Sequence, residues 1–346
     1  MTVKRVKRNL VARGPHVRSA PSFALSALII GALSATAVLM PGSSGALPIG
    51  ITGGATANAP AKRLWTGGSK FGGCSIFPSS FVYNSPVGSF PVRPESADVI
   101  AHSNALGGHT TLQFAFWSEP LSGMHPIVVP ESQPMVPITY DQYGHVSDPG
   151  PFPIPLDAPQ EDNSDKHIIV VQQGTCALYE LWASHRSPNG WYAGTGAQWD
   201  TSINDSRPLS WPSADAAGLP ILPGLLRYDE VASGRINHAL RVIVNKTQRA
   251  VIAPATHFVG SQDDRLLPFG ARLRLRADYD ISGITGQSRI IAEALKNYGL
   301  VVADNGPNWM ISGEGDARWD DTDMDQIRRL PASAFEYIDS GPVITG

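Results

Sequence analysis

The chain has 346 residues and a formal net charge of −3, and 16% of its residues are charged, while 34 are glycine and 29 are proline. This low charge with many turn-forming residues favours a β-rich protein with long loops. The negative charge argues against general binding to nucleic acid or to an anionic membrane surface.

The first 46 residues have the pattern of a secretion signal. Basic residues crowd the first 20 positions, which contain no acidic residue, and an uncharged apolar run follows from Phe23 to Met40. Small residues then place Ser44 and Ala46 at the −3 and −1 positions that a signal peptidase accepts, which predicts cleavage after Ala46. The mature protein is then expected to be secreted and extracellular, with no membrane segment. The alternative is an uncleaved anchor, because the apolar run is close to the length that crosses a bilayer.

A flexible lead-in follows at residues 47–70, which are rich in glycine, alanine, threonine and proline, and the fold is expected to begin near Phe71. The clearest strand signal lies further on. The β-branched and aromatic runs 167–172 and 176–182 flank a short turn that contains glycine, and this pattern predicts a β-hairpin. Residues 143–163, dominated by proline, glycine and aspartate, predict a long loop.

The other strands are predicted from short apolar runs bounded by glycine or proline. They lie at residues 113–117, 191–199, 236–244, 250–255, 300–303 and 309–312, and the proline-punctuated residues 126–140 are expected to form edge strands or extended loops. A further segment, 272–280, alternates strictly, so its arginine and aspartate side chains are expected on one face and its apolar side chains on the other. Helical spacing predicts one helix from Ser282 or Thr285 to Tyr298 and a second, amphipathic helix over 321–330.

These elements predict a mainly β fold, sandwich or jelly-roll like, with a C-terminal α/β elaboration. The economical arrangement is a single β-rich secreted domain over residues 71–346. Two domains divided near residue 265 are the alternative.

The two cysteines, Cys74 and Cys176, both lie in the predicted exported part. A disulfide between them is the expected state in an oxidising compartment. Two buried free thiols are the alternative. A thiol catalyst is disfavoured, because neither cysteine lies beside a histidine or in a CxxC pair.

The densest set of chemically active residues lies in residues 217–241. Its catalytic candidates are Tyr228, Asp229, Glu230, His238 and Arg241. Glycosidic hydrolysis needs two carboxyl groups, whereas elimination from a uronate needs a cation and a proton-abstracting side chain. On an extended strand the adjacent Asp229 and Glu230 diverge, so at most one faces a substrate. A plain ion pair of Arg227 with Glu230 and a hydrogen-bonded strand histidine at 238 are the structural alternatives.

Substrate binding is expected from further cations and rings. The candidates are Arg227, His257, Arg272, Arg274, Trp309 and Trp319. One or two of the five tryptophans in loop-like settings are expected to be exposed in a groove, and Trp309 and Trp319 are the better candidates. His167, His185, His238 and His257, with Asp165 or Asp200, lack a tight metal-ligand spacing, so no metal is predicted. No phosphate loop, GxGxxG or GxSxG occurs, and no cofactor is predicted.

Four segments resemble a pattern in an uncharacterised family of secreted bacterial proteins. They are SDPGPFPIPLDAP from Ser147, SDKHIIVV from Ser164, AGLPILPGLLRYDEVASGRINHALR from Ala217, and DISGITGQSRIIAEALKNYGLVVADNG from Asp280. The resemblance covers most of the chain after about Phe77. It implies export and one recurring fold, but no activity and no catalytic residues.

The functional hypothesis from the sequence is a secreted enzyme that acts on an extracellular polysaccharide or cell-wall glycan by hydrolysis or elimination. The alternative is a secreted or cell-surface carbohydrate-binding protein without catalysis. A protein-directed hydrolase or inhibitor is a weaker third reading, because no motif in the chain indicates it.

Overall fold

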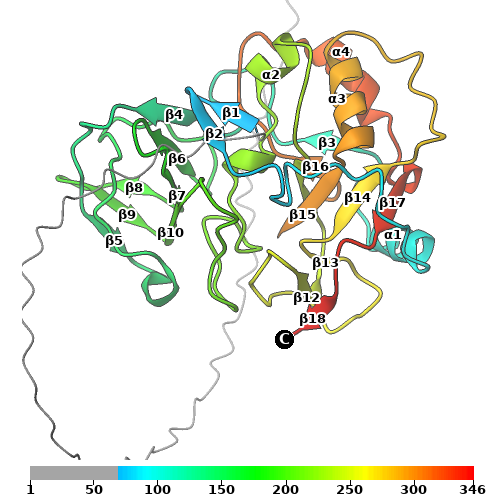
Figure 1. The fold of residues 1–346 in the computed structure, drawn as a ribbon, viewed down its shortest axis with the longest axis horizontal. Helices are drawn as coiled ribbons and strands as arrows, with labels where there is room; N and C mark the ends of the chain where they lie inside the picture. The colour runs from blue at the N-terminus through cyan, green and yellow to red at the C-terminus, as the bar shows by residue number, and fades with distance from the viewer. Residues whose placement is uncertain (1–68) are drawn as a thin grey trace, which may run out of the picture. The chain divides into compact units, whose positions relative to one another are not determined.

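The computed structural model describes residues 69–346 (Figure 1). The predicted signal, residues 1–46, lies outside the described residues, as does the predicted lead-in except for its last two positions. Ser69 and Lys70 belong to the first strand, β1 (Ser69–Phe71). Within residues 69–346, no helix is long and apolar enough to cross a membrane.

The mainly β class is confirmed, with the strands of the described part in five sheets. The first sheet pairs β1 with β2 (Cys74–Ile76). A four-stranded sheet has the order β10 (Thr195–Trp199), β7 (Leu178–Trp182), β6 (Ile168–Gln172), β4 (Pro126–Val129). A three-stranded sheet has the order β5 (Ile138–Tyr140), β9 (Trp191–Ala193), β8 (His185–Arg186).

The other two sheets are built mainly from the C-terminal half of the chain. A six-stranded mixed sheet has the order β17 (Phe335–Ile338), β14 (Arg272–Leu275), β15 (Leu300–Asn305), β11 (Leu240–Val244), β16 (Met310–Ile311), β3 (Gln113–Phe114). A three-stranded sheet has the order β13 (Pro268–Phe269), β12 (Gln248–Ile252), β18 (Val343–Thr345). The helices are α1 (Ser96–Ala105), α2 (Tyr228–Ala232), α3 (Gly286–Asn297) and α4 (Asp321–Arg328), with single 3-10 turns η1 (Gly144–Val146), η2 (Leu222–Gly224) and η3 (Ala332–Ala334).

The predicted hairpin is present as β6 and β7, which pair antiparallel. Every residue of β6 is buried, because the sheet is covered on both faces. Ile169 and Val171 join the main hydrophobic cluster, whereas Ile168 and Val170 join a second cluster to which Trp191 of β9 also contributes. The second cluster therefore packs the three-stranded β5-β9-β8 sheet onto the four-stranded sheet. A sheet covered on both faces explains why the β6 sequence is continuously apolar instead of alternating.

The predicted α/β elaboration is also present. The helix α3 begins after Thr285, close to the predicted start, and α4 is capped by Asp320, whose Oδ1 accepts a hydrogen bond from the Asp323 backbone N–H at 3.0 Å. The two helices lie side by side, and α3 also packs against β14 (Figure 1). Gly299 ends α3 at a φ of +74°, where a Cβ atom would lie 2.0 Å from the carbonyl oxygen of Leu273. Only glycine fits this close approach.

The predicted disulfide is confirmed between Cys74 and Cys176, 102 residues apart in sequence. Cys74 starts β2, and Cys176 lies in the turn between β6 and β7. The bond therefore ties the first two-stranded sheet to the four-stranded sheet. The described residues contain no free cysteine.

Three local expectations are wrong. The alternating strand stops at Leu275. Arg272 is buried at 2% exposure because residues around Ser85 and Phe90 and the end of α3 cover it, and its Nη2 donates to the carbonyl oxygens of Ser85 and Tyr298. The segment that holds Asp229 and Glu230 is helical, not extended.

The third wrong expectation is the exposure of Trp309 and Trp319 in a groove. Both are buried, with exposures of 1% and 4%, because their indole N–H groups find partners inside the fold. The Trp309 Nε1 donates to Asn104 Oδ1 at 2.7 Å, and the Trp319 Nε1 donates to the carbonyl oxygen of Glu314 at 2.9 Å.

Candidate functional site

The structure joins three of the predicted residues in one ion-pair cluster. Glu230 Oε1 lies 2.6 Å from Arg227 Nη2 and accepts a hydrogen bond from Ser69 Oγ at 2.9 Å, while Glu230 Oε2 lies 2.8 Å from His238 Nε2. His238 is fully buried, and its Nδ1 donates to the carbonyl oxygen of Ala239 at 2.8 Å. The cluster thus fastens β1, α2 and the start of β11 to one another.

Glu230 is held as an ionised, neutralised carboxylate. Burial alone would raise its pKa, but His238 and Arg227 outweigh burial and lower the pKa of Glu230 to about 2. Glu230 lines a cavity of about 580 Å³ together with Glu314, whose pKa burial raises to about 7. Donors from three side chains already occupy both Glu230 oxygens, which is the arrangement of a structural anchor and leaves little capacity for attack on a substrate.

The remaining residues of the predicted catalytic segment do not join this cluster. Asp229, 80% exposed, forms an ion pair with Arg318 at 2.9 Å. The Tyr228 ring packs edge-on against Trp319, with the Arg318 guanidinium 4.3 Å above it. Arg241 is buried elsewhere, at 1% exposure. The predicted catalytic residues are therefore divided between separate places.

The two arginines of β14 bind backbone and a surface carboxylate. Arg272 is buried on the carbonyl oxygens described above. Arg274 Nε lies 2.9 Å from Glu336 Oε2, and its Nη1 donates to the carbonyl oxygens of Val87 and Phe90 at 3.0 Å each. These contacts fix the chain between β2 and α1 against β14.

A second cavity of about 590 Å³ collects chemically active side chains from distant parts of the chain. We call it the Asp304 cleft. Its polar and aromatic lining includes Tyr143, Asp165, Trp182, Asp215, His257 and Asp304. Tyr143 precedes η1, Trp182 ends β7, His257 follows β12, and Asp304 lies in β15. Of the residues predicted from the sequence to bind substrate, His257 lines this cleft.

Asp304 reaches the cleft because of how β15 pairs. The strand β15 runs parallel to β11, and the register shifts after Val242↔Val302, so that Ile243 pairs with Asp304 and Ala303 is left unpaired. Such a bulge changes the direction of the following side chains. Asp304 therefore lies near the carboxyl end of a parallel strand, the edge where ligands bind in α/β sheets.

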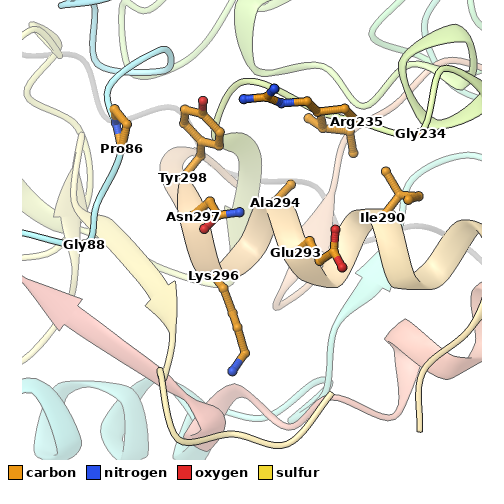
Figure 2. Close-up of a pocket in the computed structure, with 11 residues that line it drawn as sticks. Pro86, Gly88, Gly234, Arg235, Ile290, Glu293, Ala294, Lys296, Asn297 and Tyr298 are labelled. Carbon is orange, nitrogen blue, oxygen red and sulfur yellow. The ribbon is translucent and has the colours of Figure 1, made fainter. Parts of the chain in front are cut away.

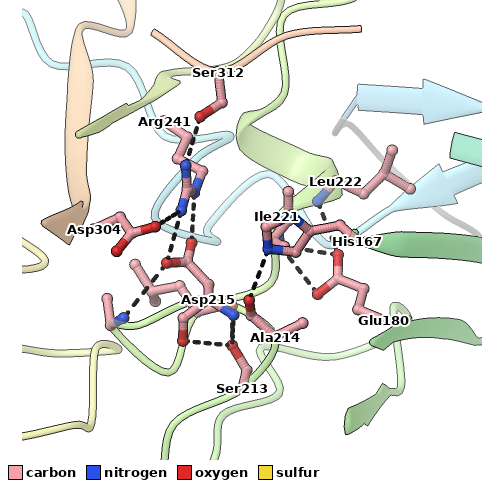
Figure 3. A network of polar contacts seen from close by, with 12 residues as sticks. His167, Glu180, Ser213, Ala214, Asp215, Ile221, Leu222, Arg241, Asp304 and Ser312 are labelled. Carbon is pink, nitrogen blue, oxygen red and sulfur yellow. Dashed lines mark hydrogen bonds and ion pairs between the residues drawn. The ribbon is translucent and has the colours of Figure 1, made fainter. Parts of the chain in front are cut away.

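The buried guanidinium of Arg241 binds two of the aspartates that line the cleft, Asp215 and Asp304 (Figure 3). Arg241 Nε lies 2.8 Å from Asp215 Oδ2, and Arg241 Nη2 lies 2.7 Å from Asp304 Oδ2, while Ser312 Oγ accepts from Arg241 Nη1. Asp215 is completely buried, and burial raises its pKa to about 6 against the opposing effect of Arg241. Buried charges are retained only where they are paired and hydrogen-bonded, as here.

The segment that carries Asp215 is fixed from several sides. The Ser213 hydroxyl donates to the carbonyl oxygen of Leu219 at 2.6 Å and accepts from the Asp215 N–H at 2.9 Å. The His167 Nε2 contacts the carbonyl oxygen of Ala214 at 3.2 Å (Figure 3). The Nδ1 of His167 pairs with Glu161. Burial opposes protonation of His167, but the hydrogen bond and charge of Glu161 prevail and raise its pKa. The cleft wall is therefore preorganised.

His257 presents a basic nitrogen at this cleft. Its Nδ1 lies 2.8 Å from the carbonyl oxygen of Ala216, so Nδ1 carries the hydrogen and Nε2 carries the lone pair. Burial lowers the pKa of His257, which keeps the ring neutral at neutral pH. A neutral imidazole with one fixed tautomer can accept a hydrogen bond or a proton at Nε2.

Two aromatic rings complete the cleft. The Trp182 and Tyr143 ring centroids are 6.3 Å apart with an interplanar angle of 36°, and Tyr143 is 46% exposed. The Trp182 Nε1 donates to Asp165 Oδ1 at 3.2 Å, which fixes both side chains. Partly exposed rings next to polar groups are suited to a ligand with one apolar and one polar face.

A third cavity, of about 510 Å³, lies beside α3 (Figure 2). Two of its three charged side chains are engaged outside it: Glu293 pairs with Arg289 at 2.7 Å, and Lys296 Nζ donates to the carbonyl oxygen of Ala277 at 2.8 Å, which leaves Arg235 as the third. It contains one aromatic ring, that of Tyr298. It therefore lacks the convergence of polar groups found in the Asp304 cleft.

Across residues 69–346, no group of three or more His, Cys, Asp or Glu is arranged to hold a metal ion. Comparison of the chain with protein-family models, with curated proteins and with solved structures finds no match. The geometry of the chain itself is therefore the basis for a functional proposal.

Sequence reasoning missed Asp304, Asp215, Trp182 and Tyr143 as site residues. One signal for Asp304 was present, since Asp-Asn-Gly directly follows the buried run 300–303. Asp215 carried no local signal, because its partner Arg241 is 26 residues away in sequence.

Proposed function

We propose that this protein is a secreted enzyme that acts on an extracellular polysaccharide, that the Asp304 cleft is its active site, and that the reaction is glycosidic hydrolysis. The observation that carries the proposal is the joint lining of this cleft by two aromatic rings, the Asp165 and Asp304 carboxylates, and the neutral His257. Rings that stack on sugar faces, with carboxylates beside them, are the groups that glycoside hydrolysis uses.

Export is supported by the basic and apolar leader together with the Cys74–Cys176 disulfide, because such bonds persist in oxidising compartments. The resemblance to secreted bacterial proteins supports the same location.

Hydrolysis is favoured over elimination by the charge of the lining. Elimination from a uronate requires a cation that neutralises the substrate carboxylate. The described lining of the Asp304 cleft contains no lysine and no arginine. The one guanidinium next to it, Arg241, is buried and already shared by Asp215 and Asp304. Hydrolysis needs carboxyl groups instead, and Asp165, in the loop before β6, and Asp304, in β15, supply them.

The test is product release from a panel of plant, algal and bacterial polysaccharides, measured for the wild type, Asp304→Asn and His257→Gln. We expect the wild type to release oligosaccharides, and each variant to be slower by about 10²–10⁴-fold, the usual contribution of acid–base catalysis. Folded variants that act as fast as the wild type would show that the reaction does not use this cleft.

A non-catalytic glycan-binding protein is the second candidate. It is favoured by the contacts of Asp304, whose Oδ2 accepts from Arg241 and whose Oδ1 accepts from the Asn305 backbone N–H at 2.7 Å. A carboxylate with both oxygens engaged is better placed to orient a sugar than to attack one. Binding that depends on Trp182, without any product, would select this candidate.

A further inference from the structure

We infer that the glycan held in the Asp304 cleft carries free amino groups, as polysaccharides rich in glucosamine do. This inference rests on the proposed function and names the substrate class of the same site. It follows from the charge, the hydrogen-bonding groups and the rings of the lining, each of which favours an ammonium-bearing sugar over a neutral or acidic one.

The charge of the cleft is negative. Three aspartates, Asp165, Asp215 and Asp304, line it, and the lining has no basic residue besides histidine. Arg241 balances only one of these charges, and its guanidinium is 1% exposed behind the aspartates. His257 is neutral, so it offsets none of the remainder. An ammonium group entering the cleft gains Coulomb energy, while a uronate or sulfate group is repelled.

Two side chains of the lining, Asp165 and His257, offer acceptor atoms to a ligand. Asp165 Oδ1 accepts from Trp182 Nε1, and Asp165 Oδ2 accepts no hydrogen bond from any other described side chain or backbone group. The Nε2 of His257 is an acceptor because Nδ1 holds the hydrogen. An ammonium group supplies three donors and no acceptor, which matches such a lining better than an acetamido group does, since the latter supplies one donor and one acceptor.

The rings add to the same preference. Trp182 and Tyr143 line the cleft beside Asp165, and both present electron-rich faces that attract cations. A glucosamine unit can therefore place its ring on an aromatic face and its ammonium group near a carboxylate.

The experiment is isothermal titration of the full-length mature protein at pH 7, where Asp215, with its pKa of about 6, is ionised and His257 is neutral, with four oligosaccharides of equal length. They are a glucosamine oligomer, its fully N-acetylated counterpart, a β-glucan oligomer and a polyuronate oligomer. We expect the glucosamine oligomer to bind at least about tenfold more tightly than the acetylated one at low salt, a preference that shrinks at about 0.5 M salt because screening weakens it. Asp165→Asn should reduce the preference severalfold, whereas Asp98→Asn, an exposed change on α1, should leave it intact.

The outcomes separate the two proposals. If the β-glucan or the acetylated oligomer binds as tightly as the glucosamine oligomer and is cleaved, the amino-sugar inference is overturned and the hydrolase proposal stands. If the polyuronate binds most tightly, the charge reasoning itself is overturned. If no oligosaccharide binds or is cleaved, both proposals fail.

Discussion

Replacement of Asp215 by asparagine tests whether the Asp304 cleft is held by a buried ion pair. The Arg241 and Asp215 side chains are 1% and 0% exposed, and the guanidinium makes two contacts to the carboxylate, at 2.8 and 3.2 Å. Loss of one partner of a buried pair usually costs about 3–5 kcal/mol, since the other charge is left in a poorly solvated place. We expect about 3 kcal/mol, the lower end, because Asp304 still balances Arg241.

The assay is urea and thermal unfolding followed by circular dichroism above neutral pH, where Asp215 with its pKa of about 6 is ionised. For a mature chain of about 300 residues the expected loss corresponds to a Tm lower by roughly 5 °C. Asp278→Asn is the matched control, because Asp278 pairs with Arg276 at 3.2 Å on the surface, and such pairs contribute about 0–1 kcal/mol. If Asp215→Asn is no less stable than Asp278→Asn, the pair does not hold the cleft and the reasoning is refuted.

Three further results are expected. The stability contributed by the His167–Glu161 pair should be fully present between the ordinary pKa values of 4.5 for Glu161 and 6.5 for His167. This stability should fall as pH rises through the raised pKa of His167, and also as pH falls toward about 2, where Glu161 is protonated. Urea unfolding measured across pH checks this. If His167→Gln loses stability with rising pH as the wild type does, the prediction is contradicted. Reduction of the Cys74–Cys176 bond, which closes a loop of about 100 residues, should lower the free energy of unfolding by about 4.7 kcal/mol. Urea titrations with and without reductant measure this difference, and a difference near zero would contradict the prediction. Glu230→Gln should lower the unfolding free energy by about 3 kcal/mol yet leave glycan affinity unchanged, and a folded variant that no longer binds glycan would move the site to α2.

Local signals in the sequence were sufficient for the hairpin and for the two C-terminal helices. Two β-branched runs around one turn predict the β6–β7 pair, and apolar residues at helical spacing that end at Gly299 predict α3. Such patterns depend on residues that are close in the chain. The disulfide was predictable for another reason, since two cysteines in an exported chain leave one pairing.

The site was not predictable in the same way, because its geometry depends on contacts between distant residues. Arg241 was predicted from the sequence as a catalytic cation, yet in the structure its guanidinium is paired with Asp215 and Asp304. Arg272 belongs to an alternating segment that is typical of a half-exposed strand, but its strand is paired on both sides and its guanidinium is buried. Burial of this kind is decided by which strands become neighbours, and no local pattern reports it.

The central claim, that the Asp304 cleft binds a glycan on its aromatic rings, is tested most directly by calorimetric titration of oligosaccharides into wild type, Trp182→Ala and Tyr192→Ala. Tyr192 is the matched control, because it is 38% exposed and stacks on His185 at 5.1 Å, away from the residues that line the cleft. We predict that Trp182→Ala weakens binding by at least about tenfold, the effect of losing a stacking ring, while Tyr192→Ala binds as the wild type does. Equal binding by Trp182→Ala and the wild type would contradict the assignment of this cleft.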